Sequence, residues 1–273
     1  MRAPLPVLAL PLALNLACAA QAQGAGPDPL DFFAGQGCAI GPATRAAARQ
    51  AGLEAAAIDA LAEAAAGNPG TIRTGDWLVL PPDMCRMRPP DIESEIALTD
   101  PEVAASITPI DEYESLGGWG CFLDMDRLLE RLPAERGWSK ERAYAAYRQL
   151  VAGGLARGEL AFFSTDPLVT PWGIQVVTGD CGADLPDIDL IRADHDHLVA
   201  NFDAIIRASA VGTECTYGAI GTFFPFEEDK APPNVWTGFQ AMLITLGAGW
   251  QEGISLTEKG VPRPPLCQYP AAR

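Results

Sequence analysis

Both histidines of the chain fall in one tetrapeptide, formed by Asp194, His195, Asp196 and His197. Imidazole and carboxylate groups can together ligate zinc, copper or nickel, so these four residues are the candidate site for a divalent metal. In an extended segment the two imidazoles would share a face, whereas in a helix they would diverge by about 200°. The apolar spacing that follows favours a helix that begins here. Asp194 is then an N-cap and Asp196 a favourable first-turn charge, and we prefer this structural interpretation, with no cofactor, to a metal site.

A second candidate is an aromatic run followed at once by acidic residues, within the loop 217–233. An apolar edge with an acidic rim is typical of a surface on which a partner docks. The run could instead be a buried strand that reaches solvent at its acidic end, and burial is the interpretation that we prefer. The candidate partner contacts are Phe223, Phe224, Phe226, Glu227 and Glu228.

Residues for nucleophilic catalysis are not evident in the sequence. No serine lies in a Gly-x-Ser-x-Gly pattern, which argues against a serine hydrolase of that type. A cysteine nucleophile would require a cysteine outside a disulfide. Acidic residues are too numerous for one pair to stand out. A hydrolase that uses two carboxylates across a cleft, as glycan-acting enzymes do, therefore stays an alternative.

The chain beyond residue 22 has an even number of cysteines and no Cys-x-x-Cys pair. In an oxidising compartment this pattern favours disulfides over zinc or redox sites. The three intervals 38–85, 121–181 and 215–267 each begin and end at a cysteine, have comparable lengths and enclose the same order of local signals, which suggests three diverged copies of one unit. We therefore predict the pairs Cys38 with Cys85, Cys121 with Cys181, and Cys215 with Cys267.

The first unit predicts two helices and a hairpin. A helix over 42–50 follows a Gly-Pro start, Gly52 stops it, and a second helix covers 53–66. The segment 67–70 breaks the chain, and 71–80 has the pattern of a hairpin.

The second unit repeats this order. A helix is predicted from Met125 to Leu132, before Pro133, and another begins after the N-cap Ser139 and ends near Gly153. Strands follow at 159–163 and 172–177.

The third unit opens differently, because a helix from Asp194 to Ala208 precedes Cys215. Asn234 is predicted to cap a further helix, which Gly247 stops. A weaker strand pattern covers 250–257.

These elements predict an α+β fold of three small disulfide-closed modules, each with two helices followed by a β-hairpin, which can pack into one body. Helix, helix and hairpin is also the later part of a winged-helix module, a resemblance of shape alone. The predicted divisions are a signal peptide at 1–22, module 1 at 23–90, an acidic linker at 91–117, module 2 at 118–181, a second linker at 182–192 and module 3 at 193–273.

Charge excludes one class of partner. The chain carries 35 acidic against 19 basic residues, a formal net charge of −16, and has no basic run. Such a surface repels phosphate backbones, so nucleic-acid binding is disfavoured.

The N-terminus has the layout of a cleavable signal peptide: Arg2, an apolar stretch interrupted by prolines, and small residues around Gln21. The apolar stretch is too short to span a bilayer, and no later stretch does so. We expect a periplasmic or secreted protein without a transmembrane segment in the mature chain. A lipoprotein anchored through Cys18 is the alternative.

We expect a non-catalytic binding or scaffolding protein that contacts an envelope protein or a small ligand. The alternative is a periplasmic enzyme, either metal-dependent at residues 194–197 or a carboxylate-based hydrolase.

Overall fold

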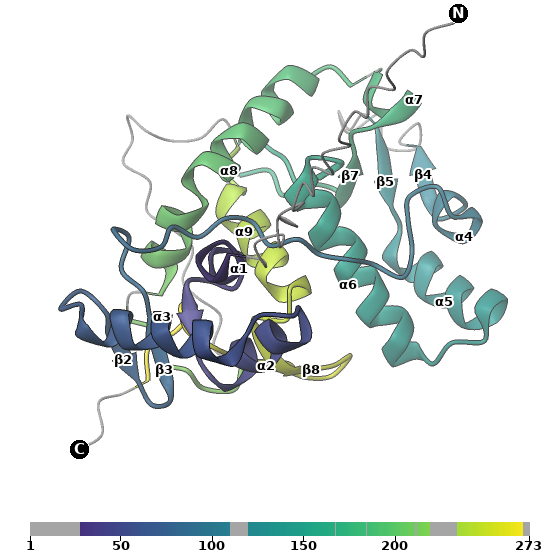
Figure 1. Cartoon of the computed structure of the whole chain (residues 1–273). Helices are drawn as coiled ribbons and strands as arrows, with labels where there is room; N and C mark the ends of the chain where they lie inside the picture. Colours follow the sequence, from purple (N-terminus) through teal and green to yellow (C-terminus); the bar gives the residue numbers. More distant parts are fainter. Residues whose placement is uncertain are drawn as a thin grey trace, which may run out of the picture.

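The computed structural model describes residues 28–109, 120–166, 168–183, 185–210, 212–218 and 234–269. Within these ranges the chain forms helices and short, mainly antiparallel strands, and the predicted α+β class is confirmed (Figure 1). The predicted signal peptide, Cys18 and the candidate contacts from Phe223 to Glu228 lie outside the described residues. No helix in the described ranges combines the length and the apolar character that crossing a bilayer requires.

The N-terminal segment packs helices around a three-stranded sheet of order β1-β3-β2. Asp28 begins the first helix, because its side chain accepts a hydrogen bond from the Leu30 amide at 3.0 Å. Gly41 is required before the next helix, since a Cβ there would lie 2.2 Å from the Trp77 ring. The predicted helices and hairpin are present, and the elements are α1 (Pro29–Ala34), β1 (Ala39–Ile40), α2 (Pro42–Gln50), α3 (Ala55–Gly67), β2 (Ile72–Thr74) and β3 (Trp77–Val79).

The middle segment forms a four-stranded sheet of order β4-β5-β7-β6. Ser139 starts the longer of its two main helices, as predicted, by accepting a hydrogen bond from the Arg142 amide at 3.2 Å. The elements are α4 (Pro101–Ala104), β4 (Ile107–Pro109), β5 (Cys121–Leu123), α5 (Met125–Arg136), α6 (Lys140–Arg157), β6 (Leu160–Ala161), β7 (Ile174–Val176) and α7 (Gly179–Ala183).

Helices α5 and α6 both run further than the sequence predicts. Helix α5 continues through Pro133, because a proline in a helix removes one amide donor without always ending the helix, and it stops where Gly137 adopts a left-handed φ of 67°. Helix α6 passes Gly153 and Gly154, whose missing side chains make room for the Ile92 carbonyl and the Leu160 side chain. Gly158 then supplies its left-handed end.

The third segment corrects two predicted caps. It contains α8 (Ile188–Ser209), α9 (Thr237–Gly247), β8 (Gln251–Ile254) and β9 (Lys259–Pro262). Helix α8 begins at Ile188, so Asp194 lies inside the helix and is not an N-cap. Asn234 does not cap α9 either, because the N-cap position is Trp236. Both polar side chains are instead buried, and they meet each other.

Three disulfides join Cys38 to Cys85, Cys121 to Cys181, and Cys215 to Cys267, the pairing that the intervals predict. The bridged residues are separated by 47, 60 and 52 positions. The first two bridged segments also share a strand order, since β1 pairs with β3 as β5 pairs with β7. In the third, the Gly218 amide donates to the Gly260 carbonyl at 3.0 Å, which places the residues after Cys215 beside β9.

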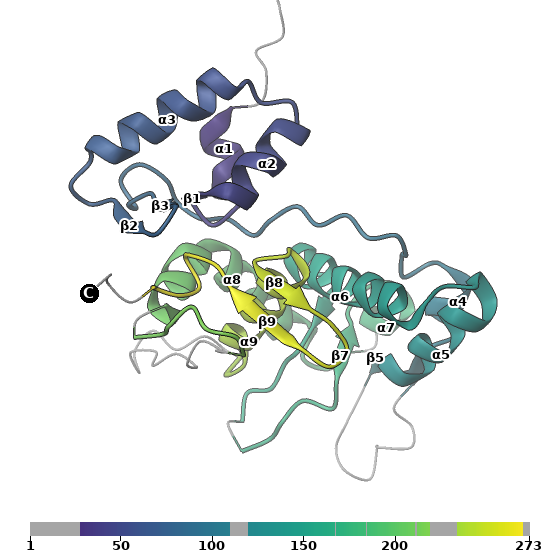
Figure 2. The same cartoon turned by 90° about the horizontal axis from the view of Figure 1, so that it is seen from below.

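One apolar core connects the three bridged segments. Its buried members include Phe33 from α1, Leu150 from α6, Phe202 from α8 and Trp250, which precedes β8. Figure 2 shows α1–α3 on one side of the chain that leads from β3 to α4, and α5, α6, α8 and α9 on the other side. The guanidinium of Arg263 lies across this division, 5.7 Å from the Trp77 ring centre and 5.9 Å from that of Trp250.

The predicted linkers contain regular structure. Helix α4 and strand β4 fall within 91–117, and α8 begins within 182–192. Strand β4 pairs with β5 and so forms part of the middle sheet. The division of the chain into three modules and two linkers stays a prediction.

Candidate ligand-binding cavities

The larger candidate site is a cavity of about 560 Å³ between the middle sheet and helices α6 and α9. We call it the aromatic cavity, after six of the residues that line it: Phe122, Tyr144, Tyr147, Phe162, Trp172 and Phe239. Two amphipathic faces build its helical walls. Helix α6 contributes residues 144, 147, 148 and 151, and α9 contributes 239, 243 and 246, at spacings that return to the same side of a helix.

Arg148 is the half-buried cation of the aromatic cavity. Its guanidinium lies 5.2 Å from the ring centre of Tyr144. Its buried Nε atom has no hydrogen-bond acceptor, and the guanidinium makes no ion pair with any residue in the described ranges. Burial lowers the pKa of Arg148, while Tyr144 partly opposes this effect.

Two further polar groups line the same cavity. Burial raises the pKa of Tyr147 to about 12, with smaller contributions from Tyr144 and from the carboxylates of Asp126 and Asp124. The phenol is therefore neutral at physiological pH and can donate a hydrogen bond. The buried Oγ1 of Thr108 has no hydrogen-bond partner within the described part of the chain.

The carboxylates of the aromatic cavity lie at the start of α5. Asp124 is the N-cap, and its side chain accepts a hydrogen bond from the Arg127 amide at 3.0 Å. The Arg127 side chain also pairs with Asp124, with 3.2 Å between Nε and Oδ2. Asp126 lies in the first helical turn. At this edge of the cavity, the charge of Asp124 is neutralised by Arg127 and by the N-terminus of α5, and Asp126 is a second carboxylate.

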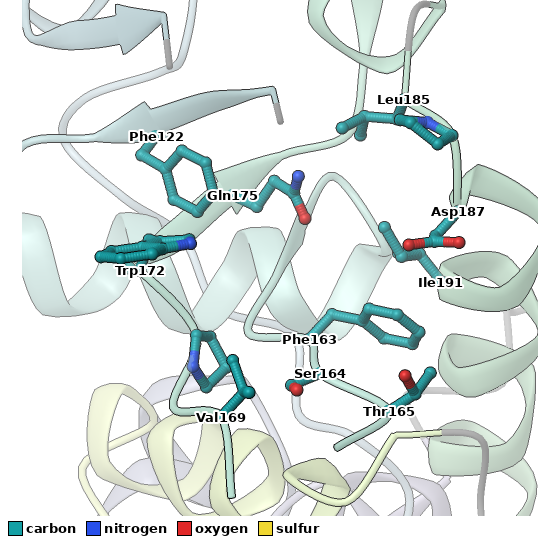
Figure 3. A pocket seen from close by; sticks show the side chains of 13 residues that line it. Phe122, Phe163, Ser164, Thr165, Val169, Trp172, Gln175, Leu185, Asp187 and Ile191 are labelled. Atoms are coloured by element: carbon teal, nitrogen blue, oxygen red, sulfur yellow. The ribbon is translucent and has the colours of Figure 1, made fainter. Parts of the chain in front are cut away.

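A smaller cavity of about 300 Å³ adjoins the first one and shares Phe122, Trp172 and Gly173 with it. We call it the polar cavity. Figure 3 shows the Gln175 amide projecting into the space between Phe122 and Phe163. Asp187 lies at the N-terminal end of α8, and Ser164 and Thr165 complete the polar lining.

A buried network around Asp194 holds the segment 162–164, which contributes to both cavities. Asp194 is 2% exposed, and it accepts hydrogen bonds from Thr237 at 2.5 Å, Asn234 at 2.9 Å and Gln240 at 2.6 Å. Asn234 in turn bonds the Phe162 carbonyl and the Ser164 amide, and Gln240 accepts from the Phe162 amide. Asp194 is therefore a positioning residue for the cavity walls.

Burial raises the pKa of Asp194 above its ordinary value, and the three hydrogen bonds and His197 oppose that effect only in part. The raised pKa makes this carboxyl easier to protonate in the folded protein than in the unfolded chain.

The candidate metal tetrapeptide is spread around α8. The Nε2 atom of His195 lies 3.1 Å from the Ala156 carbonyl, Asp196 is exposed, and Asp194 is engaged as described. Within the described ranges, no group of three or more histidine, cysteine, aspartate or glutamate side chains is placed to hold a metal ion. The segment is helical, as predicted, although the helix begins six residues before Asp194.

Comparison with protein-family models, with curated proteins and with solved structures finds no match to this chain. The cavities must therefore be interpreted from their own residues.

Sequence reasoning missed both cavities. The spacing of Tyr147, Leu150 and Val151 predicts one apolar face of a helix, and that face is present. Arg148, a charged residue beside that apolar face, was the one sequence feature that could have indicated the cavity. The sequence does not show which residues lie opposite Arg148. The opposing residues, Phe239 and Leu243, lie far along the chain.

Proposed function

We propose that the protein is an exported, non-catalytic binding protein that takes a small apolar ligand in the aromatic cavity. The observation that carries this proposal is the size and lining of the cavity. Its volume of about 560 Å³ falls within the range of about 300 to 1,000 Å³ that is typical of ligand pockets. Its lining is mostly aromatic and aliphatic, and its other side chains are one threonine, two aspartates and two arginines.

Export is supported by the three disulfides, because such bonds persist in oxidising compartments. The shared strand order of the first two bridged segments supports a repeated unit of two helices and a hairpin. In this proposal the repeat is a scaffold, and the aromatic cavity lies where the second unit meets α9 of the third.

The metal-dependent alternative gains no support from Asp194, since both of its oxygens accept hydrogen bonds from the protein. No described feature favours the carboxylate-based hydrolase over ligand binding. A scaffolding role towards an envelope protein is compatible with the fold, but the cavity favours the small-ligand form of the proposal.

The test uses N-phenyl-1-naphthylamine, a neutral probe whose fluorescence rises in apolar surroundings. We expect saturable binding to the folded protein. Leu243→Trp adds volume inside the cavity and is expected to weaken binding about tenfold or more. The matched control is Val199→Trp, because Val199 is 43% exposed on α8 and lines neither cavity. No saturable binding to the wild-type protein, or equal binding by Leu243→Trp, would contradict the proposal.

A further inference from the structure

From the unpaired guanidinium in the aromatic cavity we infer that its ligand is an organic anion, an apolar body with an acidic group that Arg148 binds. This inference rests on the proposed function and specifies the ligand of the same site.

Arg148 differs in its side-chain partners from the other partly buried arginines of the described chain. Arg136 pairs with Asp100 and Glu102, and Arg207 pairs with Asp203. Arg263, which also has a buried Nε without an acceptor, donates from Nη2 to Gln36 at 3.0 Å and lies near two tryptophan rings. Among the described residues, the one interaction of the Arg148 guanidinium is with the Tyr144 ring.

The half-buried position of the Arg148 guanidinium is unfavourable in free energy. A guanidinium that is partly removed from water without an acceptor loses hydration, and the Tyr144 ring compensates for this loss only in part. The lowered pKa of Arg148 has the same cause, and no carboxylate of the described residues contributes to it. An anionic group in the cavity would supply the missing acceptor, and a carboxylate or sulfonate can accept two bonds from one guanidinium.

The cavity separates its charges. Asp124 and Asp126 lie at the start of α5, whereas Arg148 lies on α6 and forms no ion pair with either of them, and Arg127 already pairs with Asp124. The acidic edge would therefore repel an anion and direct it towards Arg148. Thr108 lines the cavity with a buried hydroxyl that has no partner among the described residues, so it can offer one further hydrogen bond.

The test compares two probes with the same ring system. 8-Anilino-1-naphthalenesulfonate carries a sulfonate, and N-phenyl-1-naphthylamine does not. For Arg148→Met we expect the dissociation constant of the sulfonate probe to rise about tenfold or more, because a charge-assisted hydrogen bond is lost. The constant of the neutral probe should change less than about threefold. The matched control is Arg142→Met, which removes an exposed arginine from the same helix and should alter neither constant.

A second measurement needs no variant. 4-Phenylbutyrate and 4-phenylbutyramide have nearly the same shape and differ in charge. We expect the carboxylate to displace N-phenyl-1-naphthylamine from the wild-type protein at a concentration about tenfold lower than the amide. Equal displacement by the two compounds would overturn the inference even if Arg148→Met did not fold.

The outcomes separate the two proposals. If the neutral probe binds and Arg148→Met weakens both probes equally, Arg148 only packs against the cavity, and the anion inference fails while the proposed function stands. If the neutral probe does not bind the wild-type protein, the proposed function fails first. Arg148→Lys keeps the charge but not the two-pronged geometry, so it should retain part of the preference for the anion.

Discussion

Asp194 illustrates how one side chain can connect distant parts of the chain. It lies in α8, yet its three hydrogen-bond donors lie in or just before α9, some forty residues later. The spacing of apolar residues after Asp194 predicts a helix correctly. It cannot show that an asparagine, a threonine and a glutamine meet this carboxylate, because that depends on how α8 and α9 pack.

Replacement of Asp194 by alanine should destabilise the protein by about 3 kcal/mol, since the Asn234 and Gln240 amides would lose their buried acceptor. Asp194→Asn should cost about 1 kcal/mol or less. Its carbonyl can accept from both amides, and its own amide can donate to the Thr237 hydroxyl, which then donates to the Asn234 carbonyl, 2.8 Å away. Urea unfolding at neutral pH checks both values, and equal losses would show that the network does not contribute in this way.

The raised pKa of Asp194 predicts a pH dependence of stability. The folded state binds this proton more tightly than the unfolded state, so the stabilisation is present below the unfolded pKa and is lost as the pH rises through the folded pKa. Wild-type stability should therefore fall relative to that of Asp194→Asn across this window. The unfolding free energy of each protein is measured over a pH series, and the value for Asp194→Asn is subtracted from that of the wild type. The subtraction removes the contributions of groups common to both proteins, such as Glu102, whose pKa is lowered. A wild-type excess in stability that grows with pH would contradict the assignment.

At the scale of elements, helices α6 and α9 pack closely against each other. Gly247 ends α9, and a Cβ there would lie 2.2 Å from that of Ala152 and 2.6 Å from the Arg148 carbonyl. Two helix backbones can approach this closely only without a side chain between them. The same approach sets the separation of the α6 and α9 walls of the aromatic cavity.

Gly247→Ala should therefore destabilise the protein by about 2 kcal/mol and weaken binding of the neutral probe. Gly67→Ala is the matched control, because Gly67 also ends a helix and has open space where the Cβ would lie. That substitution should be neutral or slightly stabilising. Thermal unfolding of both variants, together with probe titration, tests the contact, and similar behaviour of the two would remove its support.

Local signals predict the existence of most helices but not their ends. The apolar period and the Ser139 cap are enough to predict α6, and a Gly-Pro start is enough for α2. Helix α6 passes Gly153 because neighbouring side chains need the space, which is a tertiary cause. Helix α8 begins at Ile188 and not at Asp194, because the residues between them contain no glycine or proline that would interrupt a helix.

At the scale of the whole molecule, the three bridged segments share one apolar core. The disulfide pairing is predictable because each repeated unit is bounded by its own two cysteines. The packing of the segments against one another is not predictable from those intervals, because each unit could bury its apolar faces within itself or against the other units. Both cavities arise from that shared packing, and for this reason the sequence does not reveal them.

A shared core predicts one cooperative unfolding transition for the oxidised protein. Urea midpoints measured by far-ultraviolet circular dichroism and by tryptophan emission should coincide. Three independently stable modules would instead give separated midpoints. Limited proteolysis between β3 and α4 adds a check, because cleavage there should not release a folded N-terminal fragment while the core is intact.

Trp172 lines both cavities and is 47% exposed. An indole in this position changes its emission when a bound molecule displaces the surrounding water, and it can transfer excitation energy to a nearby naphthalene ring. The protein therefore carries its own optical reporter between its two cavities. Comparison with Trp172→Phe would isolate that signal from the other five tryptophans, so that occupancy could be followed for compounds that have no fluorescence of their own.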